Sequence, residues 1–165
     1  MNLYVMRHGL AAESSPSGRD RDRPLTPEGI LGVEQIGKTL RSQHAPSLVR
    51  IVASTYVRAH HTAELMAGVL GATALPIETF SELEPDESPP LLLLGELAAM
   101  QSDALLVGHH PMVIALLRML VRDVSELPLG LHPGMLVGVT RPSEPNMSTQ
   151  IGGSFRVTTV LRPGR

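Results

Sequence analysis

The sequence contains no cysteine and no tryptophan among its 165 residues. The lack of cysteine excludes disulfides, thiolate metal sites and the phosphatases that use a cysteine nucleophile. Phenylalanine and tyrosine occur only twice each although 42% of the residues are hydrophobic, so the core must be built from aliphatic side chains and methionine. This composition is typical of a compact α/β protein, and the length predicts one domain over residues 1–165.

The chain also lacks a strong excess of either charge. Its formal net charge is −2, and lysine and arginine are spread along it. No basic patch points to nucleic acid or to an anionic membrane, so we expect neither as a partner. The stretch Met1–His8 has a brief apolar run that does not fit a signal peptide, and Leu91–Leu94 is too short to span a bilayer. We expect a soluble, cytoplasmic protein that is a monomer.

Hydrophobic periodicity predicts strands that alternate with helices. The expected strands are Leu3–Met6, Arg50–Ser54, Leu75–Thr79, Ala104–Val107, Met135–Thr140 and Phe155–Leu161. The expected helices are Pro27–Gln43, Val57–Leu70, Leu91–Met100 and Met112–Val121. Thr26 and Pro27 are a typical N-cap and first helical residue. The pattern predicts a three-layer α/β/α fold with a mostly parallel, mixed central sheet, in which the last two strands form a hairpin.

Polar side chains follow two of these strands directly. Arg7-His8-Gly9 comes after the first strand, and its glycine lets the backbone turn tightly beside a bound group. Ser54 and Arg58 lie where the second strand gives way to a helix. Free backbone N–H groups and the helix dipole make such a junction an anion site, and the arginine can add a two-pronged guanidinium contact. Alone, Ser54 could serve only as an N-cap and Arg58 only as a solvated helix residue.

A third polar turn, Gly108-His109-His110-Pro111, follows the strand Ala104–Val107. In an open α/β sheet, ligands bind beyond the carboxyl ends of the strands, so the three turns should meet at one edge. There Arg7, His8, Arg58 and His109 would form a cationic pocket suited to the oxygens of a phosphoryl group.

These motifs, in this order and spacing, resemble those of the histidine phosphatase superfamily. The matching segments are Arg7-His8-Gly9, Leu25-Thr26-Pro27-Glu28-Gly29, Ser54-x-x-x-Arg58-Ala59-x-x-Thr62-Ala63 and Gly108-His109-x-Pro111. Within the superfamily the chain is most similar to the small phosphohistidine phosphatases of the SixA type. The resemblance implies a phosphoglycerate mutase-like fold, with His8 as the nucleophile that becomes phosphorylated. It also implies that Arg7 and Arg58 hold the phosphoryl oxygens and that His109 donates to them.

Elementary chemistry agrees with these roles. A neutral imidazole is an available nucleophile near pH 7, because its ordinary pKa is about 6.5. While one nitrogen of His8 attacks, the other must hold its proton against an acceptor, for which the Gly9 carbonyl is the candidate. The two arginines and a cationic His109 would stabilise the charge of the transition state, so we expect no cofactor and no metal.

The sequence leaves the general acid open. Glu82, Glu84 and Asp86 are candidates, but Leu83-Glu84-Pro85 resembles the phosphohistidine branch at a place where many ester-cleaving relatives carry an acid. An alkoxide, whose conjugate acid has a pKa in the region of about 15.7, needs a proton donor to leave. Imidazole, with a pKa of about 6.5, needs one far less. We therefore expect phosphohistidine on a signalling protein, such as a histidine phosphotransfer domain, as the substrate.

Three alternatives stay open at this stage. The chain could be a small-molecule phosphomonoesterase or a phosphosugar mutase of the same superfamily, or a phosphoprotein-binding module without turnover.

A metal cluster is suggested by four histidines, His60, His61, His109 and His110. Such a set without nearby carboxylate ligands is a poor hydrolytic site, and adjacent helical residues point in different directions, so we expect no metal there.

Overall fold

The computed structural model describes residues 1–85, 91–100, 102–142 and 152–164. Within these residues, a six-stranded sheet has the order β3-β2-β4-β1-β5-β6. The strands are β1 Asn2–Arg7, β2 Leu48–Ala53, β3 Ile77–Thr79, β4 Asp103–Gly108, β5 Leu136–Thr140 and β6 Arg156–Leu161. Strands β1 to β4 pair in parallel, and β5 pairs antiparallel with both β1 and β6. The predicted mixed sheet and terminal hairpin are confirmed.

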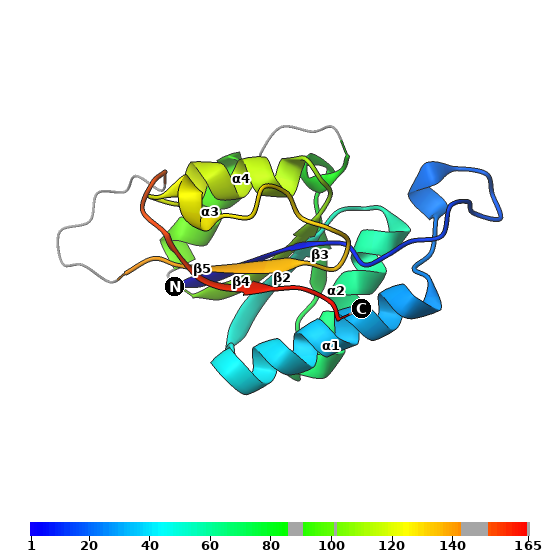
Figure 1. The fold of residues 1–165 in the computed structure, drawn as a ribbon, viewed down its shortest axis with the longest axis horizontal. Helices are drawn as coiled ribbons and strands as arrows, with labels where there is room; N and C mark the ends of the chain where they lie inside the picture. The colour runs from blue at the N-terminus through cyan, green and yellow to red at the C-terminus, as the bar shows by residue number, and fades with distance from the viewer. Residues whose placement is uncertain (86–90, 101, 143–151, 165) are drawn as a thin grey trace.

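Helices cover both faces of the sheet, which confirms the three-layer architecture. The helices α1 (Pro27–His44) and α2 (Val57–Leu70) lie on one face, and α3 (Leu91–Met100) and α4 (Met112–Leu120) lie on the other (Figure 1). The Thr26 hydroxyl caps α1 by accepting from the Gly29 N–H at 3.0 Å, as predicted. The boundaries differ little from expectation: β2 begins two residues earlier, and β3 is two residues shorter.

The strand residues alternate between two hydrophobic clusters. Leu3 and Val5 of β1 pack with α4, whereas Tyr4 and Met6 pack with α1 and α2. Because both faces are buried, the strand appears in the sequence as a continuous apolar run. Burial of each such side chain stabilises the folded state by on the order of 1.5–3 kcal/mol. A well-packed core therefore holds the carboxyl ends of the central strands in place.

The parallel register brings three strand ends to one edge. Arg7 of β1 pairs with Gly108 of β4, and Ala53 of β2 pairs with Val107. Backbone bonds continue one residue further, because the His8 N–H donates to the Gly108 carbonyl at 3.1 Å and the Ser54 N–H donates to the Val107 carbonyl at 3.0 Å. The three polar turns are therefore neighbours, with the turn after β4 in the middle.

Outside the predicted helices and strands, the described residues form short 3-10 helices at Asp20–Asp22, Ser81–Leu83 and Val124–Glu126. A three-residue turn has no hydrophobic period that a sequence could reveal. In the parts of the chain that are described, no helix has both the length and the apolar character needed to cross a membrane.

Candidate active site

The buried polar side chains gather at the carboxyl ends of strands β1, β2 and β4. Of the described residues, five polar or charged ones are buried, and all five belong to the three turns or to the start of α2: His8, Ser54, Arg58, Thr62 and His109. Burial of such groups is costly unless they are paired. A cluster of them at the carboxyl ends of parallel strands is the signature of a functional site.

His8 is held with one ring nitrogen free to react. Its Nδ1 lies 2.8 Å from the Gly9 carbonyl oxygen, which can only accept, so Nδ1 carries the proton. Its Nε2 therefore has the lone pair, and it accepts from Arg58 Nε at 3.4 Å. The expected Gly9 acceptor is present, and the tautomer suits attack through Nε2.

Gly9 ties this turn to α2. Its N–H donates to Thr62 Oγ1 at 3.0 Å, and that hydroxyl donates to the Arg58 carbonyl at 2.7 Å. A Cβ at position 9 would lie 2.7 Å from a methyl group of Val33, so any larger residue would push the turn away from α1. Thr62 therefore links the turn after β1 to α2, although the sequence indicated it only as one position of a family motif.

Arg58 differs from expectation in where its guanidinium points. Its Nη1 donates to the Asp20 carbonyl at 2.7 Å and its Nη2 to Asp20 Oδ2 at 3.0 Å. The guanidinium also stacks over the Tyr56 ring at 4.8 Å. Two guanidinium nitrogens thus bond to Asp20 and Nε lies next to His8, while the two-pronged contact with a bound anion stays a prediction.

Asp20 is a site residue that sequence reasoning missed. It lies in a run of alternating arginine and aspartate, Arg19–Arg23, which looks like a solvated loop. Arg23 and then Arg58 hydrogen-bond to its carboxylate and lower its pKa. The carboxylate is therefore ionised at neutral pH and fixes Arg58 from the solvent side.

The guanidinium of Arg7 has one buried donor without a partner. Its Nη1 donates to the Leu131 carbonyl at 2.7 Å, while its Nε is buried and has no hydrogen-bond partner. Burial lowers the pKa of Arg7, and the nearby Arg58 lowers it further. A buried donor of a guanidinium that lacks a partner calls for an explanation, and a bound anion would supply one.

His109 faces His8 across the site. Their ring centroids lie 4.9 Å apart, and His109 Nε2 is 3.0 Å from Ser54 Oγ. Ser54 also accepts from the Tyr56 N–H at 3.2 Å. The N-cap alternative for Ser54 was wrong, because α2 begins at Val57 with Tyr56 as its N-cap.

Both imidazoles are neutral in this environment. Burial, followed by smaller contributions from neighbouring cations, lowers the pKa of His8 to about 4. Burial, with the nearby His8 and Arg58, lowers the pKa of His109 to about 2. The expected cationic His109 is therefore not supported for the free site, since the two arginines already provide the positive charge. A neutral His109 can still donate one N–H.

We expect neither ring to titrate between pH 5 and 8, and NMR of the imidazole carbons across this range will check it. In the unfolded chain both rings take up protons near pH 6.5. The unfolded state then binds more protons below that pH, so the free energy of unfolding should fall as pH drops from 6.5 towards 4. A ring that titrates near 6.5 in the folded protein would contradict the proposed desolvation.

The three candidate acids have different surroundings. Glu84 accepts a hydrogen bond from the Thr55 hydroxyl, which itself accepts from Arg21 Nη2 at 3.3 Å. Glu82 is exposed, and its carboxylate accepts a hydrogen bond from the Ser81 hydroxyl at 3.5 Å. Asp86 lies outside the described residues. Of the candidates, Glu84 is the one bound to the turn that carries Ser54.

The histidines of α2 do not join the cluster. His60 Nδ1 lies 3.4 Å from Glu64, one helical turn along the surface. Within the part of the chain that is described, no group of three or more histidine, aspartate or glutamate side chains is placed to hold a metal ion. The described site residues bring together the imidazoles of His8 and His109 and the guanidinium of Arg58.

Known proteins share both sequence and fold with this chain. The model of the histidine phosphatase superfamily (branch 1) matches residues 3–86. An uncharacterized protein from Picosynechococcus sp. is 34% identical over 115 residues, which cover 67% of each of the two chains. The solved structure of the protein histidine phosphatase SixA complexed with tungstate is 25% identical, with a TM-score of 0.78, over 99% of this chain and 97% of that one.

A phosphoglycerate mutase from Bacillus anthracis str. Sterne shares the fold, with a TM-score of 0.63 and 17% identity over 97% of this chain and 92% of that one. Together with the mixed six-stranded sheet, this likeness confirms the phosphoglycerate mutase-like fold. The matched segment, residues 3–86, contains two of the three polar turns. The chain therefore belongs to the histidine phosphatase superfamily, is similar in structure to SixA, and is a phosphatase that works through a histidine nucleophile.

Proposed function

We propose that this enzyme hydrolyses phosphohistidine on a signalling protein, such as a histidine phosphotransfer domain, through a phosphorylated His8. The observation that carries the proposal is the buried cluster in which the neutral His8 accepts from Arg58 Nε through its Nε2, with His109 beside it and Arg7 near enough to lower the pKa of His8. In the described residues, Asp20 is the carboxylate in contact with this cluster, and Arg58 and Arg23 engage it. Among the described residues, the cluster has a nucleophile and guanidinium donors, and the carboxylate bonded to it, that of Asp20, is ionised.

The reaction takes place in two displacements. His8 Nε2 attacks the phosphorus atom while the nitrogen–phosphorus bond of the substrate breaks. The substrate ring, protonated on its other nitrogen, keeps the bonding electron pair and leaves as neutral imidazole. Water then attacks phospho-His8 and releases inorganic phosphate. Arg7 Nε, Arg58 and the N–H of His109 stabilise the charge on the three equatorial oxygens. The Gly9 carbonyl keeps the proton on Nδ1 throughout.

The leaving group decides the choice of substrate. Imidazole, whose ordinary pKa is about 6.5, departs without a strong acid, whereas an alkoxide needs one. The likeness to SixA, described as a protein histidine phosphatase and solved with the oxyanion tungstate, supports the same choice. The direct test measures hydrolysis of a phosphorylated histidine phosphotransfer domain and of alkyl and aryl phosphates by one preparation. A higher kcat/KM for the esters would overturn the proposal.

A second candidate, an ester phosphatase, is favoured by one observation. Glu84 is bound to Thr55, the residue after Ser54, so a carboxyl group does stand at the rim of the site. We expect Glu82→Gln, Glu84→Gln and Asp86→Asn each to cost well under the ~10²-fold typical of losing a general acid, with a phosphohistidine protein as substrate. Single-turnover phosphorylation of His8 measures this. A hundredfold loss in one variant would identify the acid and make an ester the better substrate.

Chelators should leave the activity unchanged. Arg7 and Arg58 already supply the positive charge that a divalent cation brings to phosphoryl transfer elsewhere. The measurement is the hydrolysis rate on a phosphohistidine protein with and without EDTA. If EDTA abolishes the activity and a divalent cation restores it, the histidines of α2 and of the turn after β4 become candidate metal ligands again.

A further inference from the structure

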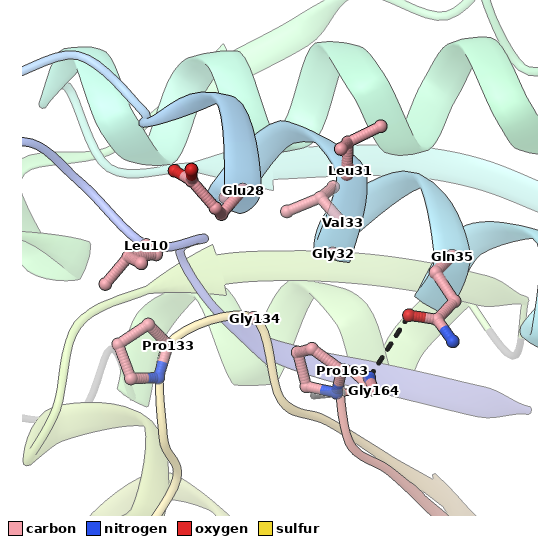
Figure 2. Close-up of a pocket in the computed structure, with 11 residues that line it drawn as sticks. Leu10, Glu28, Leu31, Gly32, Val33, Gln35, Pro133, Gly134, Pro163 and Gly164 are labelled. Carbon is pink, nitrogen blue, oxygen red and sulfur yellow. Dashed lines mark hydrogen bonds between the residues drawn. The ribbon is translucent and has the colours of Figure 1, made fainter.

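A hollow of about 460 Å³ lies beside the active site, between the start of α1 and the C-terminal segment (Figure 2). Figure 2 shows Leu10 and Pro133 on one side of it, Leu31 on α1, and Pro163 on the opposite side. We name it the α1 groove. The mechanism above makes no use of it, and its size falls in the range of sites that take ligand side chains.

The α1 groove is continuous with the catalytic turn. Leu10 lies two residues after His8, so their Cα atoms are at most about 7 Å apart. The groove residue Gly134, next to Pro133, is bound to the same turn, because its N–H donates to the His8 carbonyl at 2.8 Å. The segment that carries the nucleophile therefore also forms one end of the groove.

Two leucines at the groove are unusually exposed. Leu31 is 66% exposed and Leu10 is 48% exposed, whereas the apolar residues on the inner face of α1, such as Val33 and Leu40, are fully buried. Leu31 is thus outside the amphipathic pattern that holds α1 on the sheet. Exposed large apolar side chains that gather at a hollow mark a contact surface.

The charge of the groove contrasts with that of the pocket. Glu28 is the ionisable side chain of its lining, whereas the pocket holds Arg7 and Arg58. The groove is therefore unsuited to the phosphoryl group. It complements an apolar side chain accompanied by a lysine or arginine.

The geometry points to one occupant, and this inference rests on the proposed function: we propose that the α1 groove takes an apolar side chain of the substrate protein, next to its phosphohistidine. A standard protein interface covers about 800 Å² on each partner, a disc of roughly 16 Å radius. A protein docked with its phosphohistidine at His8 therefore reaches well past Leu10. A phosphoryl donor as small as phosphoramidate does not extend to the groove.

The test compares substrates with and without a protein surface. We expect Leu31→Gln to raise KM about tenfold for a phosphorylated histidine phosphotransfer domain, as for loss of a well-packed interface residue. Its kcat/KM for phosphoramidate should stay within about twofold of wild type, since that small molecule needs only the pocket. Glu28→Gln should raise the KM for the protein about threefold at low salt, and less at high salt.

The matched control is Leu92→Gln, which replaces a still more exposed leucine on α3, 85% exposed, across the sheet from α1 (Figure 1). It should change neither the KM for the phosphorylated protein nor the kcat/KM for phosphoramidate. An unchanged KM in Leu31→Gln, or equal losses on both substrates, would overturn the docking role. A wild-type dimer that Leu31→Gln dissociates, seen by light scattering, would make a second copy the occupant and overturn it as well. If wild type hydrolyses phosphoramidate and esters but no phosphohistidine protein, the proposed function itself fails.

Discussion

His8→Ala should lower the turnover of a phosphohistidine protein by at least about 10³-fold, because it removes the atom that accepts the phosphoryl group. The fold should survive. Although His8 is buried, its ring lies outside both hydrophobic clusters, and its Nδ1 bonds only to the neighbouring residue. We expect a change in the free energy of unfolding of about 1 kcal/mol. Steady-state kinetics and denaturant unfolding measure the two effects.

Thr26→Ala is a matched control for this prediction. It removes the cap of α1, which costs about 1 kcal/mol of stability, and the lost hydroxyl bonds to backbone atoms of Gly29 and Leu10 and not to a side chain of the site. Its activity on the same substrate should remain near that of wild type. Near-normal turnover by His8→Ala would end the mechanism, whereas equal losses in both variants would trace the effect to stability.

Arg58→Lys should cost about 10²–10³-fold in kcat/KM although it keeps the positive charge. A lysine cannot bind the Asp20 carboxylate and carbonyl together while it also points a donor at His8. The loss should appear in single-turnover phosphorylation of His8.

Arg19→Lys is the matched control, since Arg19 is an exposed arginine of the same loop that pairs with Asp22. It should leave the rate within about twofold of wild type, as for most surface substitutions. If the rate of Arg58→Lys also stays within about twofold of wild type, the positive charge alone is sufficient. The planar guanidinium of Arg58 then does not contribute to catalysis.

Most of the fold could be predicted because its sheet is buried on both faces. The apolar run Leu3–Met6 and the periodic helix after Thr26 are strong local signals, and the alternation of strands and helices implies the layers. Element ends were less accurate. β3 has only three residues at the sheet edge, and β2 extends to Leu48, where half-exposed residues weaken the pattern.

The sequence could predict which strand ends form the site. It could not predict which side chains bond to one another there. Arg7, His8, Arg58 and His109 follow from topology, because parallel strands bring their carboxyl ends together. The hold of Asp20 on Arg58 depends on a 3-10 turn inside a charged loop, which carries no periodic signal. The neutral state of His109 depends on burial beside two guanidinium groups, and a sequence does not show such distances.

One measurement tests the central claim most directly: the position of the phosphoryl group during turnover. A histidine phosphotransfer domain labelled with ³²P on its histidine is mixed with the enzyme, and the reaction is stopped in alkali within one turnover. The account predicts label on the enzyme, stable to alkali and labile to acid, on the peptide that contains His8. Transfer of all label to inorganic phosphate without any on the enzyme, or label on another residue, would contradict it.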